Sequence, residues 1–158
     1  MPGSFYSRLG STVVAAALLA AAVHAADALT PVQLQKVRHD HYHELGDAFK
    51  SVRDLTKADS PDFAALIASA EVIDKASVNQ GQWFPQGTGP EAGKTRALPE
   101  VWSKPDEFLA AQKMFSDRAP KLLEAAKAKD LPGVQAAFKE LGGACKNCHD
   151  TFRSPEEH

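Results

Sequence analysis

The stretch "GGACKNCHDTFR", Gly142 to Arg153, contains both cysteines of this 158-residue chain. Cys145 and Cys148 are three positions apart, and His149 follows the second cysteine directly. The apolar residues before them recur at the 3.6-residue spacing of an amphipathic helix. Residues three or four apart lie on one face of a helix. Both thiols are therefore expected on the same face, one turn apart, with an imidazole close by.

The spacing C-x-x-C-H is typical of covalent haem attachment. Two thiols at this separation can each add to one vinyl group of a single porphyrin, and the imidazole can then bind the iron from one side. We therefore expect one haem c per chain, attached to Cys145 and Cys148, with His149 as the axial iron ligand.

Three other roles for the thiols fit the sequence less well. A zinc site needs about four ligands, and the chain has no second cysteine pair. A thioredoxin-like redox pair is expected beside a βαβ pattern, and the sequence shows none. A disulfide across so short a gap would stabilise little and would leave His149 without a role.

The first 25 residues have the pattern of a secretory signal peptide. Arg8 is their only charged residue, an apolar run extends from Val13 to Val23, and "VHA" ends at Ala25. The run is shorter than the ~20 residues that span a bilayer, so we expect cleavage after Ala25 rather than a membrane anchor. Haem c is assembled outside the cytoplasm, and we therefore expect a periplasmic protein.

The remaining residues, 26–158, have the length of one domain with its own core. Without Arg8, one of the 18 basic residues, this part of the chain keeps a slight excess of negative charge against 20 acidic residues. Such a balance provides no basic surface for nucleic acid or for an anionic membrane. We expect neither as a partner.

Four segments of this domain have the apolar periodicity of helices, and none alternates like a strand. The first is expected to follow the N-cap Thr30 and to reach Leu55, with an apolar stripe that includes Val37. The second is expected to be capped by Ser60 and to end near Asn79.

The third helix is expected to begin after Ser103 or Lys104 and to be kinked or broken at Pro120. The fourth begins at Asp130 and contains the cysteines. A Gly- and Pro-rich connection, residues 79–102, joins the second helix to the third, with its aromatic residues pinned to the core. The sequence predicts an all-α antiparallel four-helix bundle with one long crossover loop.

The chain resembles the class II c-type cytochromes, namely cytochrome c′ and its relative cytochrome c-556. The resemblance covers residues 26–158. It rests on "CKNCHDTFR" (145–153), "VRHDHYHELG" (37–46), "WFPQGTGP" (83–90) and "KTRALPEVW" (94–102). It implies a four-helix bundle with haem between the helices, often as a homodimer.

The resemblance also identifies the residue opposite the proximal ligand. In c-556-like proteins it is a methionine, which gives six-coordinate iron suited to electron transfer. In cytochrome c′ it is a residue that does not bind, and five-coordinate iron can then admit nitric oxide or carbon monoxide. The matching position here is Tyr42, and the first helix contains no methionine. A neutral phenol is a poor ligand, so we expect five-coordinate iron shielded by Tyr42.

His41 provides an alternative, because an imidazole in the middle of the apolar stripe is unexpected and would be a strong sixth ligand. The protein would then be a low-spin electron-transfer cytochrome that meets redox partner proteins. An enzyme is not expected, because no clear acid–base pair accompanies the distal face. His39 and His43 are expected to be a solvated pair, although such a pair can also bind a divalent metal.

The resemblance implies further cofactor contacts. Arg38 would pair with a haem propionate, although a surface arginine near Glu44 fits the sequence equally well. Phe84 and Phe152 would pack on the haem, or belong to the core. Arg153 lies on the proximal side in relatives.

Overall fold

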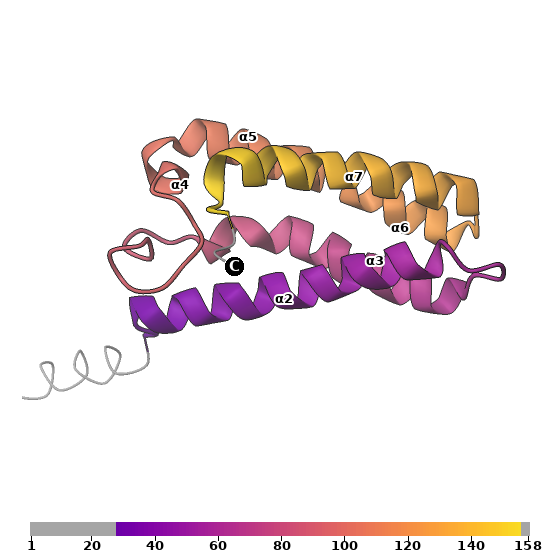
Figure 1. Cartoon of the computed structure of the whole chain (residues 1–158), viewed down its shortest axis with the longest axis horizontal. Helices are drawn as coiled ribbons and strands as arrows, with labels where there is room; N and C mark the ends of the chain where they lie inside the picture. Colours follow the sequence, from indigo (N-terminus) through magenta and orange to yellow (C-terminus); the bar gives the residue numbers. More distant parts are fainter. Residues whose placement is uncertain (1–27, 156–158) are drawn as a thin grey trace, which may run out of the picture. The chain divides into compact units, whose positions relative to one another are not determined.

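Helices make up most of residues 28–155, the part of the chain that this computed structural model describes. In chain order they are α2 (Pro31–Leu55), α3 (Phe63–Asn79), the 3₁₀ turn η1 (Gln80–Trp83), α4 (Glu100–Ser103), α5 (Pro105–Ser116), α6 (Ala119–Lys127) and α7 (Leu131–Phe152). Successive long helices reverse direction, with α5 and α6 together forming the third (Figure 1). The expected antiparallel four-helix bundle is confirmed. The expected signal peptide, residues 1–25, lies outside the described residues.

The start of α3 corrects one sequence prediction, because Asp62 rather than Ser60 is its N-cap. The Asp62 carboxylate accepts hydrogen bonds from the backbone N–H groups of Ala64 and Ala65, at 2.9 and 3.2 Å. An N-cap side chain must reach the free N–H groups of the first turn, and a negative charge there also suits the helix dipole. Ser60 is two positions too early to do so.

The start of α7 and the break in the third helix follow the expectations. Asp130 caps α7 by accepting a hydrogen bond from the backbone N–H of Gly133 at 3.1 Å. The third helix is broken before Pro120, since α5 ends at Ser116 and α6 begins at Ala119. Pro120 therefore lies in the first turn of α6, where its missing N–H leaves no hydrogen bond unmade.

The crossover loop contains two short helical pieces, η1 and α4, that the sequence did not predict. Its aromatic residues attach it to the bundle, as expected. Trp83 packs against the main core, and the indole N–H of Trp102 donates to the carbonyl oxygens of Phe84 and Pro85 at 3.2 and 3.1 Å. The long connection is therefore an ordered wall at one end of the bundle.

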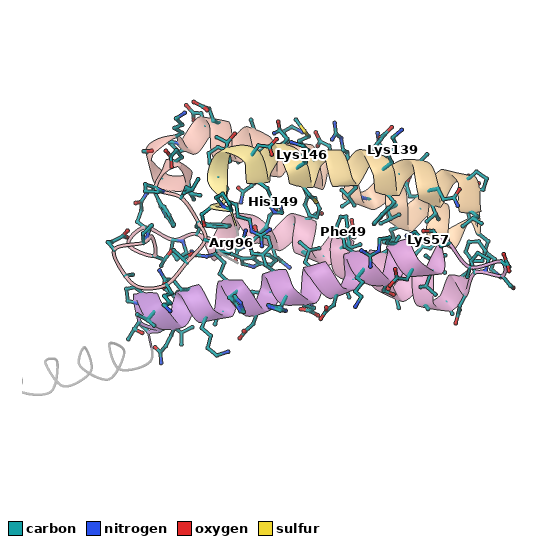
Figure 2. All side chains as sticks on the ribbon, viewed as in Figure 1. Phe49, Lys57, Arg96, Lys139, Lys146 and His149 are labelled. Carbon is teal, nitrogen blue, oxygen red and sulfur yellow. The ribbon has the colours of Figure 1, made fainter. Side chains whose placement is uncertain are left out.

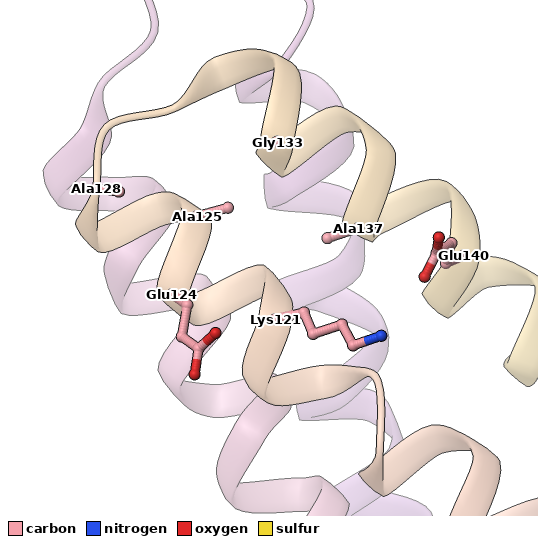
Figure 3. Close-up of a pocket in the computed structure, with 7 residues that line it drawn as sticks. All are labelled: Lys121, Glu124, Ala125, Ala128, Gly133, Ala137 and Glu140. Carbon is pink, nitrogen blue, oxygen red and sulfur yellow. The ribbon is translucent and has the colours of Figure 1, made fainter.

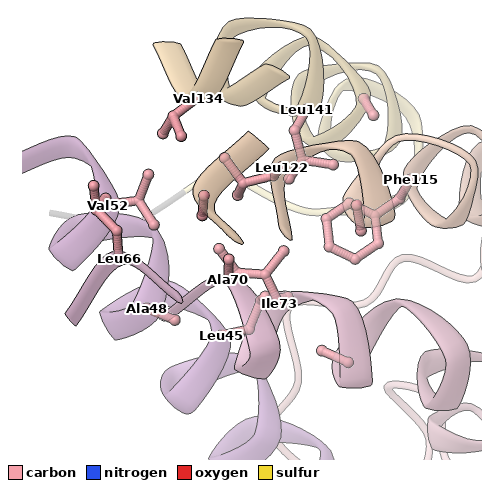
Figure 4. Packing of buried hydrophobic residues seen from close by; sticks show 14 residues of the cluster. Leu45, Ala48, Val52, Leu66, Ala70, Ile73, Phe115, Leu122, Val134 and Leu141 are labelled. Carbon is pink, nitrogen blue, oxygen red and sulfur yellow. The ribbon is translucent and has the colours of Figure 1, made fainter. Parts of the chain in front are cut away.

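The main core lies between α2, α3, α6 and α7, where Figure 4 shows the packed side chains. Each fully buried Val, Leu or Ile side chain of this core contributes about 1.5–3 kcal/mol through burial. The largest apolar ones are Val52, Leu66, Ile73, Leu122, Val134 and Leu141. A second, smaller cluster of Val101, Phe108, Ala111 and Phe152 lies where α4, α5 and the end of α7 meet.

The first turns of α2 depart from the expected apolar stripe. Val37 is 38% exposed, whereas Gln35 and Arg38 are buried. This part of α2 faces the crossover loop, whose backbone carbonyl groups need donors. The side-chain amide of Gln35 donates to the carbonyl oxygens of Thr88 and Gly89, at 3.2 and 2.7 Å. Polar inner residues thus connect α2 to the loop.

Candidate functional site

A cavity of about 460 Å³ lies between α2, α5, α7 and the crossover loop. Its volume is in the range of small-molecule and cofactor sites. Around it α2 packs on α3, while α7 packs on α5 and α6. The larger apolar side chains of its wall are Leu45, Phe49, Phe84, Phe108, Phe115 and Phe152.

The last turns of α7 bring the predicted attachment residues to this cavity. Cys145, Cys148, His149 and Phe152 all line it, at the three- and four-residue spacing of one helix face. Both cysteines are free thiols and are half-buried. His149 is exposed at the mouth, on the side of α7 that faces α2, with Arg96 beside it in Figure 2.

Burial keeps the two thiols and the imidazole neutral. It raises the pKa of Cys145 to about 11, with a smaller contribution from the adjacent Cys148, whose own pKa is raised by burial as well. Burial of its inner side lowers the pKa of His149, and the positive charges of Arg153 and Arg96 lower it further. The neutral imidazole is the form that binds a metal.

Gly142 continues this face one turn before Cys145 and also lines the cavity. A Cβ atom built on Gly142 would meet nothing within 4 Å. The wall at this point is therefore bare backbone, which lets a flat group approach α7 closely.

Tyr42 of α2 lies on the wall opposite the thiols. Its ring meets Trp83 edge-on at 5.0 Å and is tilted against Phe84 at 6.0 Å. Burial raises its pKa well above the ordinary value, and the nearby Cys148 raises it further. The side chain is therefore a neutral phenol that faces Cys145 and Cys148 across the cavity.

The alternative ligand His41 is placed differently. Its ring stacks on Trp83 at 4.7 Å, 16° from parallel, and it is absent from the cavity wall. His39 reaches the mouth of the cavity and is exposed. Met114, the methionine of the described residues, packs against the main core instead.

Arg38 is buried, with 4% of its surface exposed, so the alternative of a surface arginine is wrong. Its guanidinium donates to the Trp83 carbonyl (3.3 Å), to the hydroxyl and carbonyl of Thr88 (both 2.9 Å) and to the Thr95 hydroxyl (3.0 Å). It also lies 4.8 Å from the ring centre of Phe84. All four acceptors are neutral, and no described carboxylate forms an ion pair with it, so burial lowers its pKa. An anion in the cavity would balance this charge.

Arg96 is a site residue that sequence reasoning missed. The crossover loop pairs with the end of the chain through a β-bridge between Ala97 and Arg153. The backbone N–H of Ser154 donates to the Arg96 carbonyl at 2.8 Å, and the Arg96 guanidinium donates back to the Ser154 carbonyl at 2.7 and 3.1 Å. This pairing fixes the backbone of Arg153 beside His149. Nothing in the local sequence indicates it, because the paired residues are 56 to 58 positions apart.

Phe84 and Phe152 combine both roles that the sequence left open. Each lines the cavity, and each packs edge-on against Phe108 of the smaller core cluster, at 4.9 and 5.1 Å. Cavity wall and core are continuous here.

Two other features of the described residues do not belong to this site. A hollow between α6 and α7, lined mostly by alanines and by charged residues such as Lys121 and Glu140, opens widely to solvent (Figure 3). Within residues 28–155, no helix has the length and apolar character needed to cross a membrane.

Comparison with known proteins identifies the family. The sequence profile of the family described as Cytochrome C′ matches residues 33–153. The chain belongs to the cytochrome c′ family. Its members are haem proteins that are not enzymes, which agrees with the expectation from the sequence.

Individual members of the cytochrome c′ family match over most of the bundle. Cytochrome c′ of Pararhodospirillum photometricum is 40% identical over 108 residues, which cover 68% of this chain and 86% of that protein. Cytochrome c-554 of Cereibacter sphaeroides is 36% identical over 116 residues, 72% of this chain and 73% of the relative.

Solved cytochrome c′ structures share the fold. The nitric oxide complex of a variant of cytochrome c prime from Alcaligenes xylosoxidans has a TM-score of 0.73 and 31% identity, and covers 82% of this chain and 100% of that one. A cytochrome c′ with ligand-controlled dimer dissociation has a TM-score of 0.75 and 25% identity, and covers 81% and 99% of the two chains.

Proposed function

We propose that this member of the cytochrome c′ family is a periplasmic gas-binding haem protein whose iron has His149 as its only axial protein ligand. The haem c is attached through Cys145 and Cys148. The observation that supports this best is the cavity itself: one wall holds two thiols and an imidazole on adjacent helical turns, and the opposite wall holds a neutral phenol.

The residues present fit a haem. The aromatic wall suits the flat apolar face of the macrocycle, and the bare backbone of Gly142 allows it to lie close to α7. Arg38 supplies a buried positive charge that a propionate would balance. Arg96 and Arg153 add positive charge next to His149, which favours its neutral, metal-binding form. When bound, the haem supplies an iron that takes up a small gas molecule or a single electron.

The distal wall supports five-coordinate iron. Tyr42 is held as a phenol by burial, and a phenol with a raised pKa does not provide the phenolate that binds iron. His41 would have to leave its stacking contact with Trp83 before it could act as a sixth ligand. The exposed ring of His39 contacts the ring of His43, with the ring centres 4.7 Å apart.

Relatives support the choice of ligand. Variants of the Alcaligenes xylosoxidans protein have been solved with nitric oxide and with carbon monoxide. The proposal also includes export, directed by a signal peptide at residues 1–25, and assembly as a homodimer. Redox proteins are the alternative partners.

Two measurements test this proposal. Mass spectrometry after extraction with acidified organic solvent is expected to find one haem retained per chain, and to find it lost when both cysteines are replaced by serine. The ferrous protein is expected to have a broad high-spin spectrum that changes on addition of nitric oxide or carbon monoxide. Pigment that washes away would refute the covalent attachment. A sharp low-spin spectrum indifferent to carbon monoxide would refute five-coordinate iron.

Substitutions on α2 locate the distal residue. Tyr42→Ala removes the ring that faces the thiols and is expected to speed carbon monoxide binding. His41→Ala is the matched control, because His41 lies beside Tyr42 in sequence but outside the cavity wall. An unchanged rate in Tyr42→Ala, with an altered rate in His41→Ala, would assign the distal position to His41.

A further inference from the structure

His39 and His43 form a pair of imidazoles on the outer side of α2. The two residues are four apart, both are exposed, and their ring centres lie 4.7 Å apart with an angle of 49° between the planes. Neither ring is stacked flat on the other. The haem site uses neither of them, although His39 reaches the cavity mouth.

The ring separation allows the two imidazoles to share a metal ion when one nitrogen of each ring points at the ion. With metal–nitrogen bonds of about 2.0–2.1 Å and a ring radius of about 1.1 Å, each ring centre lies about 3.2 Å from the ion. Ring centres 4.7 Å apart then correspond to an angle of roughly 95° at the metal. A tetrahedral angle would require about 5.2 Å. The pair therefore suits an ion with ligands at right angles, as in the tetragonal geometry of copper(II) or nickel(II).

A carboxylate lies beside one of the two rings. Asp40 lies 3.5 Å from Nδ1 of His39, and its own position is fixed by an ion pair of 2.6 Å with Lys36, one turn earlier. A carboxylate next to one ring nitrogen holds the proton there and leaves the other nitrogen free to bind a metal. Nε2 of His39 is then the nitrogen left to bind the ion.

The remaining ligands would be water molecules. Among residues 28–155, no group of three or more His, Cys, Asp and Glu side chains is arranged to hold a metal ion. A site with two imidazoles and open positions discriminates between metals by the general order of affinity, in which copper(II) exceeds nickel(II) and zinc(II).

We propose that His39 and His43 form a second metal site, separate from the haem iron, that binds a divalent transition-metal ion and prefers copper(II). The ion links two successive turns of α2 and places positive charge at the cavity mouth, next to the helix segment that contains Tyr42 and Arg38. This site depends on none of the residues assigned to the haem.

The test is a titration of the haem-loaded protein with copper(II), followed by calorimetry and electron paramagnetic resonance. The spectrum is expected to show a tetragonal copper signal split by two imidazole nitrogens. His39→Ala and His43→Ala are each expected to weaken copper binding by about tenfold or more, and Asp40→Asn by about tenfold. His41→Ala is the matched control, since it removes an imidazole from the same helix but from a different face, and its affinity is expected to stay within about twofold of the wild type.

Each other outcome overturns the proposal. If the double variant His39→Ala/His43→Ala binds copper(II) as tightly as the wild type, the ion is held elsewhere. If His41→Ala weakens binding as much as His43→Ala, the pair is not the site. If zinc(II) binds more tightly than copper(II), the right-angle geometry is wrong. Circular dichroism of each variant shows whether α2 is intact, so that loss of binding is not confused with loss of the helix.

Discussion

Replacing Arg38 by methionine tests whether this buried cation holds the crossover loop on the bundle. Methionine keeps the apolar stem but removes all four hydrogen bonds of the guanidinium. Three of the acceptors belong to Trp83 and Thr88, and the fourth is the hydroxyl of Thr95. Thr88 is fully buried, so its hydroxyl oxygen loses its donor without gaining water, and its carbonyl oxygen keeps only the bond of 3.2 Å from the amide of Gln35.

The magnitude follows from two opposing contributions. Hydrogen bonds that involve a charged group contribute about 1.5–3 kcal/mol each, or about 6–12 kcal/mol for four. Removing the guanidinium also abolishes the cost of burying its charge, which is several kcal/mol. We expect the free energy of unfolding to fall by about 3–5 kcal/mol in Arg38→Met. Arg38→Lys keeps the charge but not the planar guanidinium that reaches several acceptors. Its free energy of unfolding should fall by roughly half as much as that of Arg38→Met.

The assay is urea unfolding monitored by tryptophan fluorescence. The chain has two tryptophans, and both report on this region, because Trp83 accepts a hydrogen bond from Arg38 and the ring centre of Trp102 lies 5.8 Å from its guanidinium. The control is Lys50→Met, an exposed position on the same helix, which should leave the midpoint nearly unchanged. Equal urea midpoints for Arg38→Met and Lys50→Met would refute the reasoning. A second measurement is the rate of proteolysis in the crossover loop, which Arg38→Met should raise; an unchanged rate would also refute it.

Three further predictions concern the core, a helix end and a thiol. Leu141→Ala leaves a cavity at a fully buried position and should lower the free energy of unfolding by about 2–5 kcal/mol. The control Leu109→Ala, at a side chain that is 63% exposed, should have little effect. Equal losses in the two variants would contradict the packing described. Asp130→Ala removes the cap of α7 and should cost about 1 kcal/mol by urea unfolding, and no loss would mean that the cap is redundant. In haem-free Cys148→Ser protein, burial alone still holds the pKa of Cys145 above its ordinary 9.0. Its alkylation near pH 8 should therefore be slower in the folded protein than in urea, and should accelerate about tenfold per pH unit below that pKa. Similar rates in both states would show that the thiol is not sheltered.

The sequence predicts the bundle because its helices have strong local signals. The apolar periodicity, the prolines at helix starts and the break before Pro120 all act within a few residues of one another. The predicted N-cap of α3 is wrong because the local signal is ambiguous there. Ser60 and Asp62 are both good N-cap residues on either side of Pro61, and only the path of the backbone decides between them. The short helices η1 and α4 have too few residues for a periodic pattern.

The site was partly predictable. The spacing of Cys145, Cys148 and His149 identifies one wall from sequence alone. The opposite wall depends on which face of α2 meets the cavity, and the sequence left Tyr42 and His41 as alternatives because they are neighbours. Arg96 was missed since its role arises from a bridge between the crossover loop and the chain end, which no local pattern encodes.

One continuous face of α2 explains how a core helix also builds a site. Gln35, Arg38, Tyr42, Leu45, Ala48 and Val52 follow one another at three- or four-residue steps along this face. Its polar residues meet the crossover loop, its tyrosine meets the cavity, and its apolar residues meet the core. In α7 the same order runs in reverse, from Val134 and Leu141 in the core to the cysteines at the cavity. Because the two helices are antiparallel, their non-core ends meet at the same end of the bundle. The site thus lies where the packing faces of α2 and α7 continue past the core and have reactive side chains in place of apolar ones.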